Sequence, residues 1–142
     1  MGAWDVGTFD NDTACDWAFE LHGTEDLSVV RHAIEAVLVA GTDYLDADHA
    51  CEALAACEVI ARLRGKWGEQ NAHTEALDKW VRTHPLTPAP ELVQHALEAI
   101  DRIVGQPSEL RELWDESPDA DKWHAAVAEL RARVAGHGTA AS

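Results

Sequence analysis

The sequence has few basic side chains and no apolar run long enough to span a membrane. Its 11 Lys and Arg residues stand against 26 Asp and Glu, so the formal net charge is −15 at pH 7. This charge repels phosphate backbones and anionic lipids, and we therefore expect neither nucleic-acid binding nor membrane binding. The most apolar stretch, residues 29–40, is interrupted by Arg31, His32 and Glu35. The acidity favours either a solvated surface or a basic protein or peptide as partner.

Cysteine is also scarce. The three cysteines, Cys15, Cys51 and Cys57, include no C-x-x-C pair. An odd number of unpaired cysteines is typical of a protein in a reducing compartment. The N-terminus lacks the basic region followed by an apolar run that marks a secretory signal. We therefore expect a cytoplasmic protein in which each cysteine acts as a small buried hydrophobe.

Motifs for catalysis and cofactor binding are missing as well. The sequence contains no G-x-S-x-G elbow, no phosphate-binding glycine loop, no H-E-x-x-H and no zinc-ligand spacing. Eight histidines are dispersed along the chain, so any pairing between them must come from the fold: His22, His32, His49, His73, His84, His95, His124 and His137. We expect no cofactor, and no group of residues in the sequence indicates a catalytic activity.

Apolar residues recur with helical spacing along most of the chain, and no segment alternates convincingly with period two. The pattern predicts a single all-α domain of six or seven helices over residues 1–136, followed by a flexible tail at 137–142. Glycine, proline and capping residues place the boundaries. The expected helices cover about 12–22, 24–40, 47–64, 74–82, 88–104, a short stretch after Ser108, and 117–135.

The alanine-rich segment 47–64 is predicted to be the central helix, because small side chains let neighbouring helices approach closely. Its predicted buried stripe consists of small and aliphatic residues: Ala50, Ala53, Leu54, Cys57, Ile60 and Ala61. Arg62 and Arg64 are interpreted as cations near the C-terminal end of the helix dipole. Arg131 and Arg133 are predicted to lie near the end of the last helix.

The N-terminal stretch 4–17 combines aromatic residues with several acids. Trp4 and Phe9 are predicted to form a hook that plugs the core, with Gly7 allowing a sharp turn. Asp10, Asn11 and Asp12 can each cap the first helix, and a cap at Asp10 would place Phe9 and Ala14 as a hydrophobic staple. The alternative is an acidic pocket for a cation or basic ligand, formed by residues 10–12 and Asp16.

This stretch also resembles a known family. The residues that carry the resemblance fit the pattern W-x-x-G-x-F-x-N-D-x-A-x-D-W: Trp4, Gly7, Phe9, Asn11, Asp12, Ala14, Asp16 and Trp17. The pattern is similar to the opening of the bacterial domain-of-unknown-function family 4259. Residues 53–63 also resemble the central helix of that family. Members usually have glycine where this chain has Asp5. The resemblance implies no known activity.

Further candidate residues lie in loops and at one helix start. Tyr44, the only tyrosine, and Trp67 are candidate ligand contacts, although each could instead cover the core. Asp46, Asp48 and His49 form a carboxylate–histidine cluster that could hold a transition metal. No second histidine lies three or four residues away, and acids at a helix start are favoured by the helix dipole alone.

Three functions remain open from the sequence. The first is an acidic cytoplasmic binding protein, with a protective or regulatory role, that engages a basic protein or peptide. The second is a small metal-dependent enzyme that uses dispersed Asp and His residues. The third is a small-molecule sequestration protein with a tryptophan-lined pocket between helices. The oligomeric state is expected to be a monomer or a homodimer.

Overall fold

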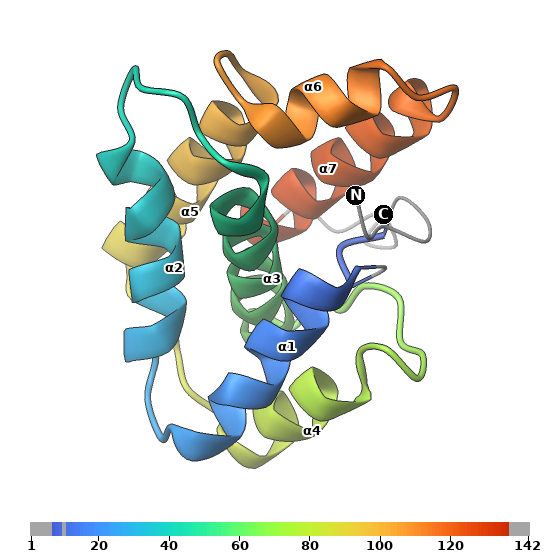
Figure 1. Cartoon of the computed structure of the whole chain (residues 1–142). Helices are drawn as coiled ribbons and strands as arrows, with labels where there is room; N and C mark the ends of the chain where they lie inside the picture. The colour runs from blue at the N-terminus through green and yellow to red at the C-terminus, as the bar shows by residue number, and fades with distance from the viewer. Residues whose placement is uncertain (1–6, 10, 137–142) are drawn as a thin grey trace.

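The computed structural model describes residues 7–9 and 11–136 (Figure 1). Its described residues form seven α-helices and no β-strand, which confirms the all-α prediction. A 3₁₀ turn at Leu21–Gly23 follows the first helix. Trp4 of the predicted hook, Asp10 and the predicted tail 137–142 lie outside the described residues. The helices are α1 (Asp12–Glu20), α2 (Ser28–Val39), α3 (Ala47–Leu63), α4 (Glu75–Thr83), α5 (Pro90–Val104), α6 (Glu109–Asp115) and α7 (Ala120–Val134).

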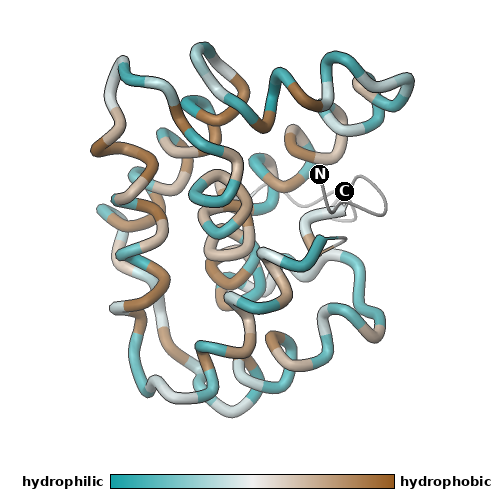
Figure 2. Tube along the Cα trace, viewed as in Figure 1, coloured by the Kyte–Doolittle hydropathy of each residue, from teal (hydrophilic) through white to brown (hydrophobic). Residues whose placement is uncertain are grey.

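Helix α3 lies at the centre of the fold and contacts each of the other six α-helices (Figure 1). The predicted central helix is thus confirmed. Its burial extends beyond the predicted stripe, because Ala55, Ala56 and Val59 are as fully buried as Ala53. Figure 2 shows that the surrounding helices mix hydrophobic and hydrophilic residues along their length, as amphipathic helices do. None of the described helices has both the length and the apolar character needed to cross a membrane.

The first helix is capped by Asn11, one of the three predicted candidates. The Asn11 side-chain oxygen accepts a hydrogen bond from the Ala14 backbone N–H at 2.8 Å. The alternative with Asp10 as cap, and with it the proposed staple between Phe9 and Ala14, is therefore wrong. Phe9 itself is buried in the core, as predicted.

Two helix starts differ from the prediction. Helix α2 begins at Ser28 because Thr24 closes the preceding 3₁₀ turn, where its backbone N–H and its hydroxyl both donate to the Leu21 carbonyl. Helix α7 begins at Ala120, because Ser117 Oγ accepts from the Asp119 N–H and holds a turn there instead of capping a helix. Short polar side chains favour turns and caps alike, so the sequence did not distinguish the two.

Candidate functional site

A cavity of about 740 Å³ lies between α1, α3, α6 and α7, and we call it the tryptophan pocket. One part of its wall is apolar. Trp114 of α6 and Trp123 of α7 are stacked there, with ring centroids 6.3 Å apart and planes within 9° of parallel. Further apolar side chains come from three helices: Leu54, Leu110, Leu113 and Val127. This wall can cover a flat or branched apolar group.

The other part of the wall is polar and acidic. It consists of residues 11–13 at the start of α1, Asp46, Asp48 and His49 at the start of α3, and Glu109 at the start of α6. Thr13 Oγ1 donates to Asp48 Oδ1 at 3.3 Å and so joins α1 to α3. The tertiary structure thus brings Asn11 and Asp12 together with the predicted metal cluster, although more than 30 residues separate them in the sequence.

Hydrogen bonds hold the remaining acids in place. Asp46 caps α3 by accepting from the His49 N–H at 2.8 Å, and its second oxygen lies 2.8 Å from His49 Nδ1. Glu109 Oε1 accepts from the Ala47 N–H at 2.8 Å and so connects α6 to the start of α3. The first turn of α3 therefore positions both carboxylates, that of its own cap Asp46 and that of Glu109 from α6.

The candidate metal residues line the pocket without converging on one point. Asp46 pairs with His49, whereas Asp48 pairs with Thr13. Over residues 7–9 and 11–136, no group of three or more His, Cys, Asp and Glu side chains is arranged to hold a metal ion. Burial, and then the charges of nearby acids, raise the pKa of the neighbouring Cys51 thiol to about 12, which disfavours the thiolate at neutral pH.

The remaining predicted contact residues that the structure describes, Phe9, Tyr44 and Trp67, lie outside this pocket. Tyr44 is exposed, and its hydroxyl donates to Glu112 Oε1 at 2.9 Å, which raises the pKa of the phenol to about 12. Trp67 is half-buried, with the guanidinium carbons of Arg62 and Arg82 at 5.6 and 5.2 Å from its ring centroid. Trp114 and Trp123, which do line the pocket, have the helical spacing of core residues, and this spacing does not distinguish a core position from a pocket wall.

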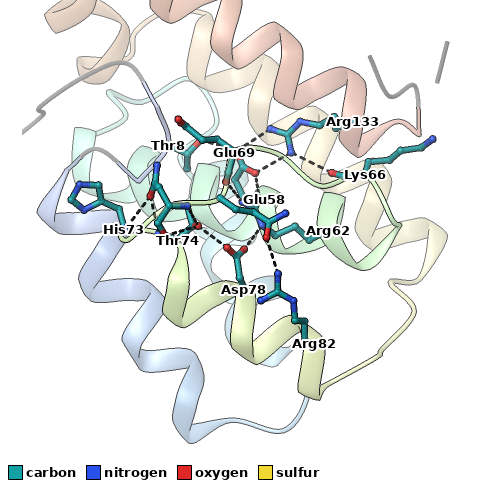
Figure 3. A network of polar contacts seen from close by, with 12 residues as sticks. Thr8, Glu58, Arg62, Lys66, Glu69, His73, Thr74, Asp78, Arg82 and Arg133 are labelled. Carbon is teal, nitrogen blue, oxygen red and sulfur yellow. Dashed lines mark hydrogen bonds and ion pairs between the residues drawn. The ribbon is translucent and has the colours of Figure 1, made fainter. Parts of the chain in front are cut away.

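A second group of polar residues is buried beside the pocket, and we call Glu58, Arg62, Asp78 and Arg133 the buried ion network (Figure 3). Glu58 of α3 accepts from Arg62 Nη1 one turn further along the helix. It also accepts from Arg133 of α7 through Nη1 at 3.0 Å and Nη2 at 3.1 Å. Arg62 Nε donates to Asp78 of α4 at 2.7 Å, so the network ties three helices together.

Backbone and hydroxyl groups complete this network. Arg62 Nη2 donates to the Glu69 carbonyl at 2.8 Å, and Arg133 Nη1 donates to the Lys66 carbonyl at 3.3 Å. Both bonds hold the connection between α3 and α4 (Figure 3). Thr74 Oγ1 donates to Asp78 Oδ2 at 2.6 Å. Each buried charge therefore has an opposite charge and further hydrogen bonds, as a buried ion requires.

Arg62 and Arg133 lie in the last turns of their helices, as predicted, but they are also buried, only 2% and 4% exposed, and their place in an ion network was not predicted. The sequence contained one signal for the network, the four-residue spacing of Glu58 and Arg62 on a helix. The partner Arg133 lies 75 residues from Glu58, so no local pattern could reveal it. Thr8 Oγ1 also donates to Glu58 at 3.1 Å, and Thr8 lines the tryptophan pocket as well. The segment at residues 7–8 therefore separates the pocket from the network.

Comparison with known proteins places the chain in a family. A search among curated proteins and a search among solved structures each found no match. The family model described as Domain of unknown function (DUF4259) matches residues 2–126 of the 142-residue chain. This confirms the family resemblance, and because the match covers most of the sequence, the chain belongs to this family of domains of unknown function.

Proposed function

We propose that this protein binds a ligand with an apolar body in the tryptophan pocket. The observation that carries the proposal is the pocket itself, in which the stacked Trp114 and Trp123 lie within one cavity of about 740 Å³. Small-molecule sites commonly have volumes of roughly 300–1,000 Å³, an apolar lining and a few placed polar groups. Four helices supply the walls, so the cavity does not depend on a single loop. The small-molecule sequestration hypothesis is therefore the best supported of the three.

A basic protein or peptide is the second candidate partner. The net charge of −15 supports it, as do the carboxylates of Asp12, Asp16 and Glu20, which are exposed on α1 beside the exposed ring of Phe19. A cytoplasmic location is proposed with either partner, and its support is that the buried Cys51 and Cys57 are both free thiols.

Native mass spectrometry of untagged protein from its own host separates these partners. The pocket proposal expects a small co-purifying mass that leaves when the protein unfolds. If the partner is a basic protein, we expect a co-purifying polypeptide mass that is present at low salt and lost at moderate salt, because screening weakens contacts between exposed charges. A bare monomer or homodimer at both salt concentrations would contradict tight binding of either partner.

Partly filling the pocket is expected to weaken ligand binding without unfolding the protein. Ala126 is half-buried and lines the pocket, whereas its neighbour Ala125 is exposed on the same helix. Ala126→Leu should weaken binding of a neutral apolar probe, 4-phenylbutanol, by about tenfold or more, since tenfold needs only about 1.4 kcal/mol of lost contact. Isothermal titration calorimetry measures the affinity. The matched Ala125→Leu should bind as the wild type does, and equal weakening in both variants would contradict the site.

A further inference from the structure

The polar end of the tryptophan pocket has a strong excess of one charge. Four carboxylates line it, from Asp12, Asp46, Asp48 and Glu109, and the lining contains neither Lys nor Arg. The lining contains one histidine, His49, and its Nδ1 already lies 2.8 Å from Asp46. Asp12 is exposed and lines the pocket, and no described residue donates a hydrogen bond to it.

Helix dipoles offset part of this negative charge but leave a net negative excess. Helices α1, α3 and α6 all begin at this end, and each N-terminus carries a partial positive charge of roughly +0.5 at most. Three such ends therefore offset about one and a half of the four negative charges. The first-turn N–H groups of Ala14, Ala47 and His49 are also already bonded to side-chain oxygens. An anionic ligand would meet few open donors here and several carboxylates.

The charge and the apolar wall are separated along α3. Asp48, Cys51 and Leu54 line the pocket from successive turns of this helix, so the wall changes from acidic to apolar over six residues. At 1.5 Å rise per residue this corresponds to about 9 Å. A ligand that fills the pocket therefore places one end among carboxylates while its body lies against Trp114 and Trp123.

We propose that the ligand is an amphipathic organic cation, in which a short stem joins an apolar or aromatic body to an ammonium or guanidinium group. This inference rests on the binding function proposed above and adds the ligand's charge and orientation. The cation lies between the carboxylates of α1 and α3, and the body lies on the tryptophan wall. The same chemistry occurs in a free amine and in a Lys or Arg side chain next to an apolar residue of a peptide.

The test is a series of probes that share one body and differ in charge. In calorimetry at low salt, 4-phenylbutylamine should bind most tightly, 4-phenylbutanol about tenfold more weakly, and 4-phenylbutyrate most weakly of the three. In 1 M NaCl, where the screening length is about 3 Å, the preference should fall to about twofold. Acetyl-Phe-Lys-amide and its Phe-norleucine analogue test the peptide source. If the affinity ratio of the lysine to the norleucine peptide exceeds the ratio of the amine to the alcohol, a peptide is the source. If the amine-to-alcohol ratio is the larger, a free amine is the source.

Two variants localise the effect. Asp48→Asn keeps an oxygen that accepts from Thr13, and it should reduce the preference for the amine over the alcohol about threefold or more. Glu98→Gln removes the same charge from the exposed face of α5, outside the pocket, and should leave the preference intact. Equal binding of amine and alcohol, or tightest binding of the carboxylate, overturns the cation inference and leaves the pocket standing. Failure of all three probes to bind overturns both.

Discussion

Replacement of Glu58 by glutamine is expected to lower the free energy of unfolding by about 3–5 kcal/mol. The carboxylate is buried and accepts hydrogen bonds from both Arg62 and Arg133, which are themselves buried. Glutamine has nearly the same shape and fills the same space, but it carries no charge. Asp78 would then be the one buried carboxylate left in the network to balance two buried guanidinium groups. Leaving a buried charge uncompensated has a large free-energy cost.

Urea unfolding followed by circular dichroism measures this loss. The matched control is Glu129→Gln, which removes a carboxylate from the same Arg133 at a position where the Glu129 side chain is 39% exposed. A partly solvated pair contributes little, so we expect a change of about 1 kcal/mol or less. Equal losses in the two variants would show that burial of the Glu58 charge is not what makes this ion pair important.

The same network predicts how acid affects the wild type and the Glu58→Gln variant. Burial by itself would raise the pKa of Glu58, but the hydrogen bond from Arg133 and the charges of Arg62 and Arg133 outweigh it and lower the pKa. A carboxylate with a lowered folded-state pKa stabilises the protein above its unfolded-state pKa, near 4.3, and that stability is lost as the pH falls through the folded-state value. The stability gap between wild type and Glu58→Gln should therefore narrow below about pH 4.

Enlargement of Ala55 is expected to be the second most damaging change, with a loss of about 1–3 kcal/mol for Ala55→Leu. On a helical wheel Ala55 lies opposite the predicted buried stripe of α3, so the sequence pattern assigns it to solvent. In the structure it is fully buried, because helices surround α3 on every side. Three added carbon atoms must therefore push a packed neighbour away.

Thermal unfolding of Ala55→Leu and Ala125→Leu provides the comparison. Ala125 lies on the exposed face of α7, and the same substitution there should change the free energy of unfolding by less than about 0.5 kcal/mol. If Ala55→Leu were as stable as this control, the face of α3 that carries Ala55 would have room for a larger side chain, contrary to the packing described above.

Most helices were predictable because their signals are local. The stripe in α5, the glycine at its end and the acid-rich start of α3 depend on residues within one or two turns of each other, and these elements lie within two residues of their predicted positions. The boundaries at Thr24 and Ser117 were wrong for a related reason. A short polar side chain can cap a helix or hold a turn, and the surrounding structure decides between them.

The tryptophan pocket was predicted only in fragments. Asn11, Asp12, Asp46, Asp48 and His49 were recognised as unusual because they cluster in the sequence. Their common cavity, and the stacked Trp114 and Trp123 opposite them, depend on how α1, α3, α6 and α7 are placed in space. A tryptophan at a core position of an amphipathic helix has the same sequence pattern whether it meets another side chain or borders a cavity.

The sequence by itself therefore determined the all-α class, the helices and the small-residue centre around which they gather. Helical periodicity arises because one face of each helix is buried, and an alanine-rich stretch allows close packing because its side chains are small. Both signals can be read from residues that are neighbours in the sequence. Only the tertiary structure decided that α3 is enclosed on all sides, that Glu58 and Arg133 pair across 75 residues, and that three acidic helix starts meet above two tryptophans. These features depend on the docking of distant segments, for which the chain has no local code.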